Sequence, residues 1–313
     1  MVQVSVVIPT FRRPELLKIA VDSSLDQTSL ASDACEIVVV DNSPEGSARN
    51  QIEAYGPNGR FDVRYVHEPR PGISRARNAG IKAARGRFIA FLDDDEDAAP
   101  GWLDALLGAT SHGAQAVFGP VHPRLEATGE PVPTHALRLF RRDFSVPDGS
   151  DITRFGAHLG AGNSLFEKAA CFAAEEPFAY EYDGLGGEDS DLIFHLVQRG
   201  IRLTWAAKAL VTEFVPANRL QLGYLAQRSF RNGQIRTFVR YRARQSSGPA
   251  WLGWMAVGVI QAGVWGTASV AVWPFRRQAA AKLRLAAAGG LGKIFWMRRF
   301  WPISYPSHVP VGQ

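Results

Sequence analysis

Short apolar runs alternate with helix-like stretches over the first 120 residues of the 313-residue chain. The apolar runs are rich in β-branched residues, whereas the stretches between them repeat apolar positions at helical spacing. This alternation predicts an α/β fold with a doubly wound, mainly parallel sheet of the Rossmann type. Strands are expected at Val4–Ile8, Glu36–Asp41, Val63–His67, Arg87–Leu92 and Ala116–Gly119, and helices at Glu15–Asp26, Ser74–Arg85 and Trp102–His112.

The regular pattern ends near residue 120. Residues 121–155 are rich in Pro, Arg, Gly and Asp, which predicts a mobile loop over a binding site. A helix is then expected from Asp191 to Arg199, closed by Gly200, and a further strand region at Ile201–Val211. We therefore expect residues 1–215 to form one domain.

The rest of the chain divides into three segments. An arginine-rich helical connector is expected over 216–250, an uncharged hydrophobic segment over 251–275 and a basic amphipathic tail over 276–313. As a helix, the middle segment has a length of about 37 Å, enough to cross a hydrocarbon core of about 30 Å. Trp residues and arginines at its ends are typical of a membrane boundary, the alternative being a buried soluble helix. A spanning and an in-plane arrangement both stay open.

Charge divides the chain in the same way. The net charge is +5, and Glu213 is the last acidic residue. Up to Glu213 the chain has 21 Lys and Arg against 30 Asp and Glu, a net charge of −9, whereas 14 basic residues follow. A basic, Trp-rich tail predicts contact with an anionic surface, and its long uncharged run favours membrane lipid over nucleic acid.

Neither cysteine stands in a metal-binding or disulfide pattern. Cys35 and Cys171 lie in apolar surroundings without a CxxC or Cys/His spacing, which fits a reducing compartment. No signal peptide is expected before the first strand, because residues 2–8 are β-branched rather than a basic stretch followed by an apolar one.

Four carboxylates in a row, Asp93 to Glu96, follow the strand candidate 87–92. In an extended chain Asp93 and Asp95 would point to one face and Asp94 to the other. Crowded acids disfavour one another's charge unless a cation lies among them, and Mg²⁺ or Mn²⁺ takes one or two carboxylates plus water and phosphates. The run therefore predicts a divalent metal site, the alternative being an acidic cap of the next helix. Pro9-Thr10 and Asp41-Asn42 also follow strand ends, which places them at the same sheet edge.

Five segments carry a resemblance to a known family: Val6 to Phe11, Val39 to Ser43, Gly72 to Gly80, Phe91 to Asp95, and Gly186 to Asp189. Together they resemble family-2 glycosyltransferases with the GT-A fold, over roughly residues 1–240. Within that family the chain is most similar to bacterial exopolysaccharide glycosyltransferases with a hydrophobic C-terminal segment.

The resemblance implies a metal-dependent, inverting glycosyltransferase of the hexosyltransferase type with Mn²⁺ or Mg²⁺ as cofactor. Such an enzyme moves a sugar from a nucleotide-diphosphate donor, UDP-sugar by resemblance, to a saccharide or lipid-linked acceptor. The implied setting is cell-surface polysaccharide synthesis at the cytoplasmic face of the inner membrane.

The same resemblance assigns the donor site. Asp95 is the implied direct metal ligand, with Asp93 and Asp94 at the ribose or in the metal shell. The remaining implied donor contacts are Asp41 to the uracil, Pro9, Thr10 and Phe11 beside the base, and Arg77 at the diphosphate. From the residues alone, Asp41 also fits a turn or cap, and Arg77 a solvated helix face.

The base is implied by a second motif. Inversion needs a group that takes a proton from the acceptor hydroxyl, and a carboxylate is the usual choice. Gly187-Glu188-Asp189 matches the family's ED motif, which makes Asp189 the base, Glu188 an orienting or acceptor-binding group and Asp191 the reserve candidate. An N-cap role for this motif is the alternative.

One position departs from the family pattern. Glu213-Phe214-Val215-Pro216 stands where many relatives have a His in a His-x-Val-Pro-like context. Either Glu213 replaces that His as an oxygen ligand of the metal, or the site uses one protein ligand fewer.

Two other functions stay open at this point. A sugar nucleotidyltransferase on a similar fold would need a glycine-rich triphosphate loop after the first strand, and residues 9–14 contain no glycine. A non-catalytic, membrane-bound sensor of nucleotide sugars or polysaccharide would not need the Glu188-Asp189 pair.

Overall fold

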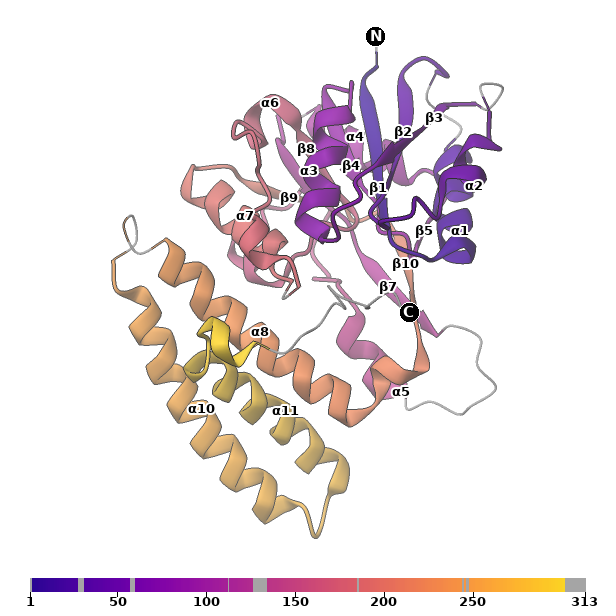
Figure 1. Cartoon of the computed structure of the whole chain (residues 1–313). Coiled ribbons are helices and arrows are strands. Elements are labelled where there is room, and N and C mark those ends of the chain that lie inside the picture. The colour runs from indigo at the N-terminus through magenta and orange to yellow at the C-terminus, as the bar shows by residue number, and fades with distance from the viewer. Residues whose placement is uncertain are drawn as a thin grey trace. The chain divides into compact units, whose positions relative to one another are not determined.

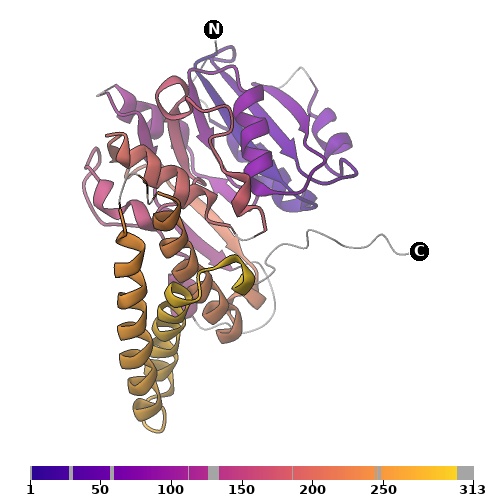
Figure 2. The same ribbon diagram turned by 60° about the vertical axis from the view of Figure 1, so that its left-hand side comes forward.

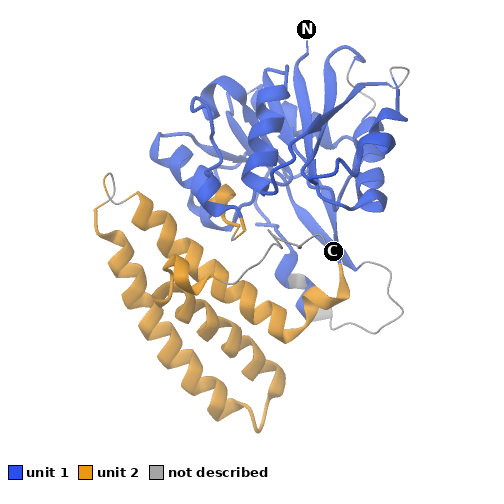
Figure 3. Cartoon of the chain, in the orientation of Figure 1, with its two compact units in different colours: residues 1–127, 134–183, 191–215 blue, residues 128–133, 184–190, 216–313 orange. Residues whose placement is uncertain are grey.

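The computed structural model describes residues 2–27, 31–56, 60–111, 113–125, 134–184, 186–243, 245 and 248–301. The chain forms two compact units (Figure 3). Unit 1 comprises residues 1–127, 134–183 and 191–215, and unit 2 comprises 128–133, 184–190 and 216–313. Unit 1 is an α/β body, whereas long helices dominate unit 2 (Figures 1 and 2).

The main sheet of unit 1 has seven strands in the order β3-β2-β1-β4-β8-β6-β9 (Figure 1). All neighbours are parallel except β8, which runs antiparallel to both β4 and β6. The expected mainly parallel sheet is therefore confirmed. The strands are β1 (Val4–Thr10), β2 (Cys35–Asp41), β3 (Asp62–His67), β4 (Phe88–Phe91), β6 (Ala116–Phe118), β8 (Ser164–Glu167) and β9 (Leu203–Trp205).

Helices pack on both faces of this sheet, which is why its central strands are apolar on both sides. Every residue of β1 and β2 is buried, as expected for parallel strands covered twice. One core contains apolar residues of α1 (Pro14–Leu25) and α4 (Trp102–Thr110), and the other those of α3 (Ile73–Ala83) and α7 (Glu188–Gln198). Shorter helices are α2 (Arg49–Glu53) and α6 (Lys168–Cys171).

A second, three-stranded sheet was not predicted. It has the order β5-β10-β7 and consists of β5 (Glu96–Ala98), β10 (Val211–Val215) and β7 (Val121–Leu125). The strand region expected at 201–211 contains β9 and the first residue of β10, but these two strands belong to different sheets. Residues 121–155 were expected to be a loop, but they begin with β7 and include α5 (Thr134–Leu137); residues 126–133 lie outside the described part. β5, β7 and β10 have three to five residues and are only partly buried, so no continuous apolar run marks them in the sequence.

Unit 2 contains three long helices, α8 (Leu222–Arg242), α10 (Ala250–Val272) and α11 (Arg277–Ile294). The segments expected over 216–250 and 251–275 are thus largely helical; in the basic tail the helix α11 ends at Ile294, and residues 302–313 lie outside the described part. Met255 and Gln261 of α10 contact Trp296 and Lys293 respectively, so α10 and α11 are antiparallel. Among the described residues, α10 is the one helix whose length and composition would allow it to cross a membrane.

Glycines allow α11 to approach both of its neighbours at the level of the backbone. A Cβ atom on Gly292 would collide with the carbonyl group of Phe230 in α8. A Cβ atom on Gly258 in α10 would lie 2.7 Å from the carbonyl oxygen of Gly290. Side chains larger than hydrogen would therefore force these helices apart, as in other small-residue helix contacts.

Candidate active site

The acidic run lies beyond the carboxyl end of β4 and is joined to the end of β1. Thr10 donates its hydroxyl to Asp94 Oδ2 at 2.9 Å. Arg13, just before α1, places Nη1 2.9 Å from Asp94 Oδ1 and 3.0 Å from Asp95 Oδ2. Two neighbouring parallel strands thus deliver these polar groups to one sheet edge, where ligands bind in doubly wound folds.

The residues expected to lie beside the nucleotide base are found at the end of β1. Pro9 and Thr10 were expected to follow the first strand, but they are its last two residues, and both are buried. Phe11 comes directly after the strand and is half-buried. Their expected contacts with a nucleotide stay a prediction.

The acidic residues do not alternate as an extended chain would require. Glu96 N donates to Asp93 O at 3.0 Å, so residues 93–96 form a turn. Asp94 and Asp95 consequently share Arg13, which corrects the expectation that Asp93 and Asp95 share a face. Asp93 instead lies 3.2 Å from Nη2 of Arg77, whose side chain is 5% exposed. Arg77 is therefore a buried partner of the acidic run and not a solvated residue of α3.

Burial and mutual repulsion disfavour the ionised form of these carboxyl groups. Burial, followed by the charges of Asp94 and Asp93, raises the pKa of Asp95 to about 7. Burial and the charge of Asp93 raise the pKa of Glu96 well above its ordinary range, although Glu96 Oε2 accepts a hydrogen bond from Asp93 N at 3.0 Å. A site that disfavours its own negative charge is stabilised by an added cation.

Glu213 lies beside the acidic run. It is paired with Glu96 across the antiparallel strands β10 and β5, and Phe214 N donates to Asp95 O at 2.8 Å. Its charge also raises the pKa of Asp95. The structure thus brings Glu213 to the acidic run, although nothing in it tests Glu213 as a metal ligand.

The donor atoms at this edge fit a hard divalent ion that keeps part of its shell for substrate. Within the described residues, no three His, Cys, Asp or Glu side chains form a ready-made metal cluster. Carboxylate oxygens with raised pKa values are nevertheless suitable ligands for Mg²⁺ or Mn²⁺, which take one or two of them and complete the shell with water and phosphate. The residues present therefore fit an ion that binds together with a diphosphate.

Asp41 is buried at the end of β2, where it organises the following loop. Its Oδ1 accepts hydrogen bonds from Ser43 N and Ser43 Oγ at 3.0 and 2.7 Å, and its Oδ2 accepts from Ala48 N at 2.7 Å and from Tyr65 OH at 3.2 Å. The turn-forming role is therefore present in the structure. Its implied uracil contact stays a prediction.

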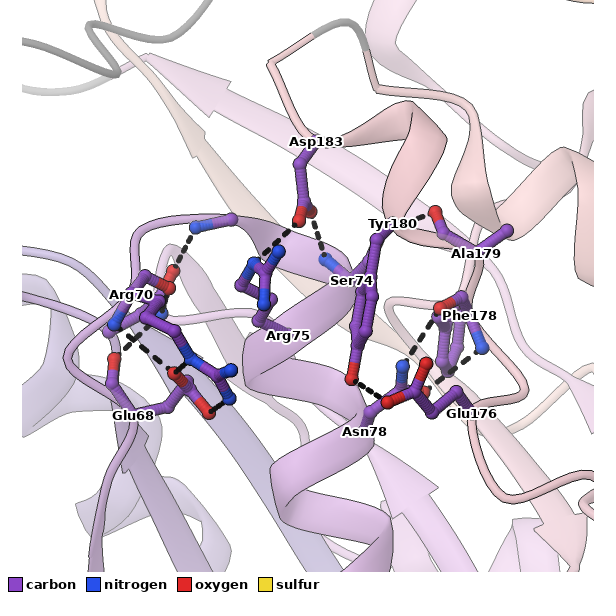
Figure 4. A network of polar contacts seen from close by, with 12 residues as sticks. Glu68, Arg70, Ser74, Arg75, Asn78, Glu176, Phe178, Ala179, Tyr180 and Asp183 are labelled. Atoms are coloured by element: carbon purple, nitrogen blue, oxygen red, sulfur yellow. Dashed lines mark hydrogen bonds and ion pairs between the residues drawn. The ribbon is translucent and has the colours of Figure 1, made fainter.

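Polar residues of segment 72–80, which has a glycine at each end, contact residues 178–183 (Figure 4). Ser74 N and Ser74 Oγ donate to Asp183 Oδ1 and Ala179 O, each at 3.0 Å. The Asn78 amide donates to Phe178 O at 2.8 Å and accepts from Phe178 N at 3.0 Å. Most polar residues of this segment therefore attach residues 178–183 to α3, whereas Arg77 contacts the acidic run.

Glu188 and Asp189 are the first two residues of α7, in unit 2. Glu188 is buried, and Asp189 Oδ1 accepts a hydrogen bond from Ser190 N at 2.6 Å. The reserve candidate Asp191 is buried in unit 1, where its Oδ1 accepts from Tyr182 OH at 2.8 Å. Asp191 is buried whereas Asp189 is half-buried, so exposure favours Asp189 as the candidate base. These roles are still predictions.

Two arginines at the candidate site were missed in the sequence. Arg13 contacts both Asp94 and Asp95, and Arg142 bonds the carbonyl oxygens of residues 119, 160, 162 and 163 at 2.8 to 3.1 Å. Arg142 thereby positions the loop beside the acidic run, because a Cβ on Gly162 would lie 2.5 Å from Asp93 Oδ2. An Arg in a Pro- and Gly-rich loop gives no pattern by which to recognise it. For Arg13, the one available signal was its position directly after the first strand.

Solved structures of other glycosyltransferases share this fold. A mannosyltransferase of Pyrobaculum calidifontis, PcManGT, in complex with GDP-Man and Mn²⁺ superposes with a TM-score of 0.61 at 16% identity, over 94% of this chain and 87% of that chain. Residues 1–349 of TarS from S. aureus, in complex with UDP-GlcNAc, give a TM-score of 0.54 at 14% identity, over 93% and 90%. The GT-A fold is thereby confirmed.

The sequence comparisons identify the family. The family model "Glycosyl transferase family 2" matches residues 5–167. The succinoglycan biosynthesis protein ExoM of Rhizobium meliloti (strain 1021) is 33% identical over 279 residues, which cover 85% of this chain and 83% of that protein. Validoxylamine A glucosyltransferase of Streptomyces hygroscopicus subsp. jinggangensis (strain 5008) is 29% identical over 64% of this chain and 52% of its own length. The chain therefore belongs to glycosyl transferase family 2 and is a glycosyltransferase.

Proposed function

We propose that this glycosyltransferase is metal-dependent and inverting, and that it transfers a sugar from a nucleotide-diphosphate donor during cell-surface polysaccharide synthesis. The acidic turn after β4 carries this proposal, because it combines buried carboxylates of raised pKa with two arginines. The name of ExoM supports an exopolysaccharide product, and the nucleotide sugars bound to TarS and PcManGT support the donor class. UDP-sugar is our proposed donor, and a saccharide or lipid-linked saccharide our proposed acceptor.

The residues at the acidic turn divide the work of donor binding. Asp95 and Asp93 would hold Mn²⁺ or Mg²⁺, with Glu213 as a further oxygen ligand. When bound, the ion supplies positive charge that stabilises the departing nucleoside diphosphate. Arg77 and Arg13 bring fixed charge to the same diphosphate, and Asp94 orients Arg13. Pro9, Thr10, Phe11 and Asp41 shape the side on which the base and ribose bind.

Proton transfer is assigned to the start of α7. We assign Asp189 as the base that takes the proton of the acceptor hydroxyl as the new glycosidic bond forms. No shared proton or covalent intermediate is needed, because in a single displacement the acceptor oxygen attacks as the diphosphate leaves. Glu188, buried at the first position of α7, would orient the base or bind the acceptor.

Unit 2 is proposed to attach the enzyme to the cytoplasmic face of the inner membrane. The uncharged outer side of α10 favours contact with lipid, but α11 packs along it and carries exposed Lys282 and Arg284. Moving such charges to the centre of a bilayer costs several kcal/mol. We therefore favour an in-plane arrangement over a spanning one.

Thermal stabilisation and turnover with a panel of UDP-, GDP- and dTDP-sugars, each with and without Mn²⁺ or Mg²⁺, test this proposal. We expect one donor class to raise Tm only when the ion is present, because ligands that bind the folded state stabilise it. Asp189→Asn should keep this Tm shift while transfer falls about 10²- to 10⁴-fold. Stabilisation without any metal dependence would refute the metal assignment, and loss of donor binding in Asp189→Asn would make Asp189 a structural residue.

A further inference from the structure

The proposed base Asp189 follows a stretch of chain that contains three glycines. We call residues 184–190 the ED segment. Its φ angles in the left-handed region, where glycine is favoured, are 87°, 79° and 103° at Gly184, Gly186 and Gly187. Among the described residues, nothing lies within 4 Å of a Cβ atom built on Gly184 or Gly186, whereas Gly187 lies against Ile235 of α8. Packing at the first two glycines therefore does not hold the start of the ED segment in one conformation.

Proton transfer requires more order than such a stretch supplies by itself. A general base acts only within hydrogen-bonding distance of the hydroxyl, and a displacement of about 1 Å can cost about 100-fold in rate. Ordering a flexible stretch also costs conformational entropy, which is smaller when other contacts already fix its ends. The position of Asp189 therefore depends on the contacts made at the two ends of the ED segment.

Asp183 fixes the first end on the N-terminal turn of α3 (Figure 4). Its Oδ1 accepts a hydrogen bond from Ser74 N at 3.0 Å, and its Oδ2 lies 3.2 Å from Nε of Arg75. The side chain of Asp183 is 16% exposed. A carboxylate is stabilised both by the N-terminal end of a helix and by an arginine. These contacts, all within unit 1, attach the residue that directly precedes the first glycine to α3.

Gly72 leaves the space that this carboxylate occupies. A Cβ atom on Gly72 would lie 2.4 to 2.6 Å from the carboxyl carbon and both carboxyl oxygens of Asp183, which is closer than such atoms can approach. The guanidinium carbon of Arg75 also lies 4.4 Å from the ring centroid of Tyr180. The start of α3 and the chain before the ED segment are thus matched in shape as well as in charge.

A buried hydrogen bond holds the two ends of the stretch together. Tyr182 OH donates to Asp191 Oδ1 at 2.8 Å, and both residues are buried in unit 1. Because this bond joins the residues on either side of positions 183–190, those positions form a closed loop. The ED segment with Asp189 therefore begins and ends at fixed points of unit 1.

The same helix also reaches the acidic turn. Besides Ser74 and Arg75 at its start, α3 contains Arg77, whose Nη2 lies 3.2 Å from Asp93 Oδ1. One rigid helix thus contains a residue of the proposed donor site and the attachment point of the segment that leads to the proposed base.

We propose that Asp183 is a positioning residue for sugar transfer: its attachment to α3 fixes the start of the ED segment and so orders Asp189 for proton removal. The hydrogen bond between Tyr182 and Asp191 completes this role by closing the loop. Because Asp183 acts through the backbone and not on the donor, its loss should lower the rate and leave donor binding unchanged. The inference rests on the proposed base.

UDP with Mn²⁺ is the probe of donor binding, measured by isothermal titration calorimetry. Release of UDP from UDP-glucose, UDP-galactose and UDP-N-acetylglucosamine, with water in place of the acceptor, measures the rate. The water oxygen bonds to the anomeric carbon as the bond to the diphosphate oxygen breaks, UDP leaves with the electron pair, and Asp189 takes the proton. Asp183→Ala should lower this rate about 30- to 100-fold, whereas the Kd of UDP should change less than about twofold.

Two milder variants and one control accompany Asp183→Ala. Asp183→Asn keeps an oxygen for Ser74 N but loses the charge beside Arg75, and Tyr182→Phe removes only the hydroxyl. Each should lower the rate about tenfold, as expected for the loss of one polar contact. Glu176→Gln removes a carboxylate charge from an exposed position nearby, where Glu176 accepts from Tyr180 OH at 2.8 Å, and should change neither rate nor Kd.

A nitroxide label attached to Ser190→Cys reports the order of the ED segment without any substrate. Cys35 and Cys171 are buried, so the introduced thiol is labelled selectively. Asp183→Ala and Tyr182→Phe should narrow the electron paramagnetic resonance lines at room temperature, because the label becomes more mobile. Glu176→Gln should leave the line shape unchanged.

Several outcomes would overturn the proposal. Weaker UDP binding together with the slower rate would make Asp183 a general structural residue, and unchanged line shapes would show that the ED segment needs no attachment to α3. If Asp183→Ala does not fold, as judged by circular dichroism, Asp183→Asn and Tyr182→Phe provide the same test. A full rate in Asp189→Asn would refute the base alone, and no turnover of the three UDP-sugars would refute the donor alone, since the line shapes still test the role of Asp183.

Discussion

Like charges lie near one another in both units: Asp93, Asp94 and Asp95 at the end of β4, and in unit 2 Arg236, Arg240 and Lys293, which form a cationic cluster. The carboxylates have charged partners from within the fold, Arg13 at 2.9 and 3.0 Å and Arg77 at 3.2 Å. In the cationic cluster, Arg240 lies against the Trp254 ring and donates to the Arg236 carbonyl oxygen, and Lys293 donates to the Gln261 side-chain oxygen. The difference is one of internal compensation: arginines neutralise part of the acidic turn, whereas α8, α10 and α11 contain no Asp or Glu.

The strongest test of the acidic turn is Asp95→Ala. Metal-dependent turnover should fall about a thousandfold, because transition-state stabilisation of several kcal/mol by the ion would be lost. Steady-state rates across Mn²⁺ concentrations measure this, and the Mn²⁺-dependent rise in Tm should disappear as well. Asp97→Asn, in β5 just beyond the turn, is the matched control and should retain both. Undiminished turnover in Asp95→Ala would separate the acidic turn from metal binding.

Arg142→Met tests whether the Arg142 guanidinium holds the loop beside the acidic run in place. Its guanidinium satisfies four carbonyl oxygens, so its loss should destabilise unit 1 by about 3 kcal/mol. Chemical denaturation followed by tryptophan fluorescence measures the change. Arg141→Met is the neighbouring control, because the exposed Arg141 makes only an ion pair with Asp143 at 2.7 Å. Similar losses in the two variants would contradict the special role of Arg142.

Glu36 is a buried carboxylate whose charge is compensated by partners within the fold, and no ligand is proposed for it. Burial would raise its pKa, but hydrogen bonds from Ser5, Arg85 N and Arg64 outweigh burial and lower the pKa below its ordinary 4.5. Glu36 therefore stabilises the fold above pH 4.5, and this contribution is lost as the pH falls through its lowered pKa. Glu36→Gln should lower stability by about 2 kcal/mol at pH 7 and less at pH 4. A loss independent of pH would show that packing, and not charge, explains the effect.

Arg236→Gln should have the smallest effect and the opposite sign. Without lipid, removing one of three neighbouring cations relieves repulsion and should raise the stability of unit 2 by about 0.5 to 1 kcal/mol. Differential scanning fluorimetry in detergent detects a Tm rise of about 2 °C. Arg231→Gln, on the same helix outside the cationic cluster, should change Tm little. A clear fall in Tm for Arg236→Gln would mean that Arg236 is a structural residue.

The sequence predicted secondary structure best for strands that are buried on both faces of the sheet. The runs of β1 and β2 are continuous and apolar, so strand type and parallel order were readable from them. β5, β7 and β10 are short, half-exposed and stabilised by pairing with distant strands, which no local pattern records. The antiparallel β8 was missed for the same reason, since its partners β4 and β6 are far away in the sequence.

The sequence indicated the residue types of the candidate site but not their arrangement in space. The acidic run, Arg77 and Glu213 are brought together as the motifs indicated. The turn at 93–96 was not foreseen, because consecutive acids fit a strand end and a turn equally well. Arg13 and Arg142 gain their importance from contacts across 81 and up to 23 residues, which single-sequence patterns do not contain.

The close backbone contacts of α11 have a consequence for the rigidity of unit 2. Because Gly292 meets α8 and Gly290 meets α10 without intervening side chains, the three helices cannot slide along one another to any great extent. The Cα positions of Arg236, Arg240 and Lys293 are therefore fixed by the fold, and only their side chains rotate. The entropy of ordering the three helices relative to one another is thus lost during folding.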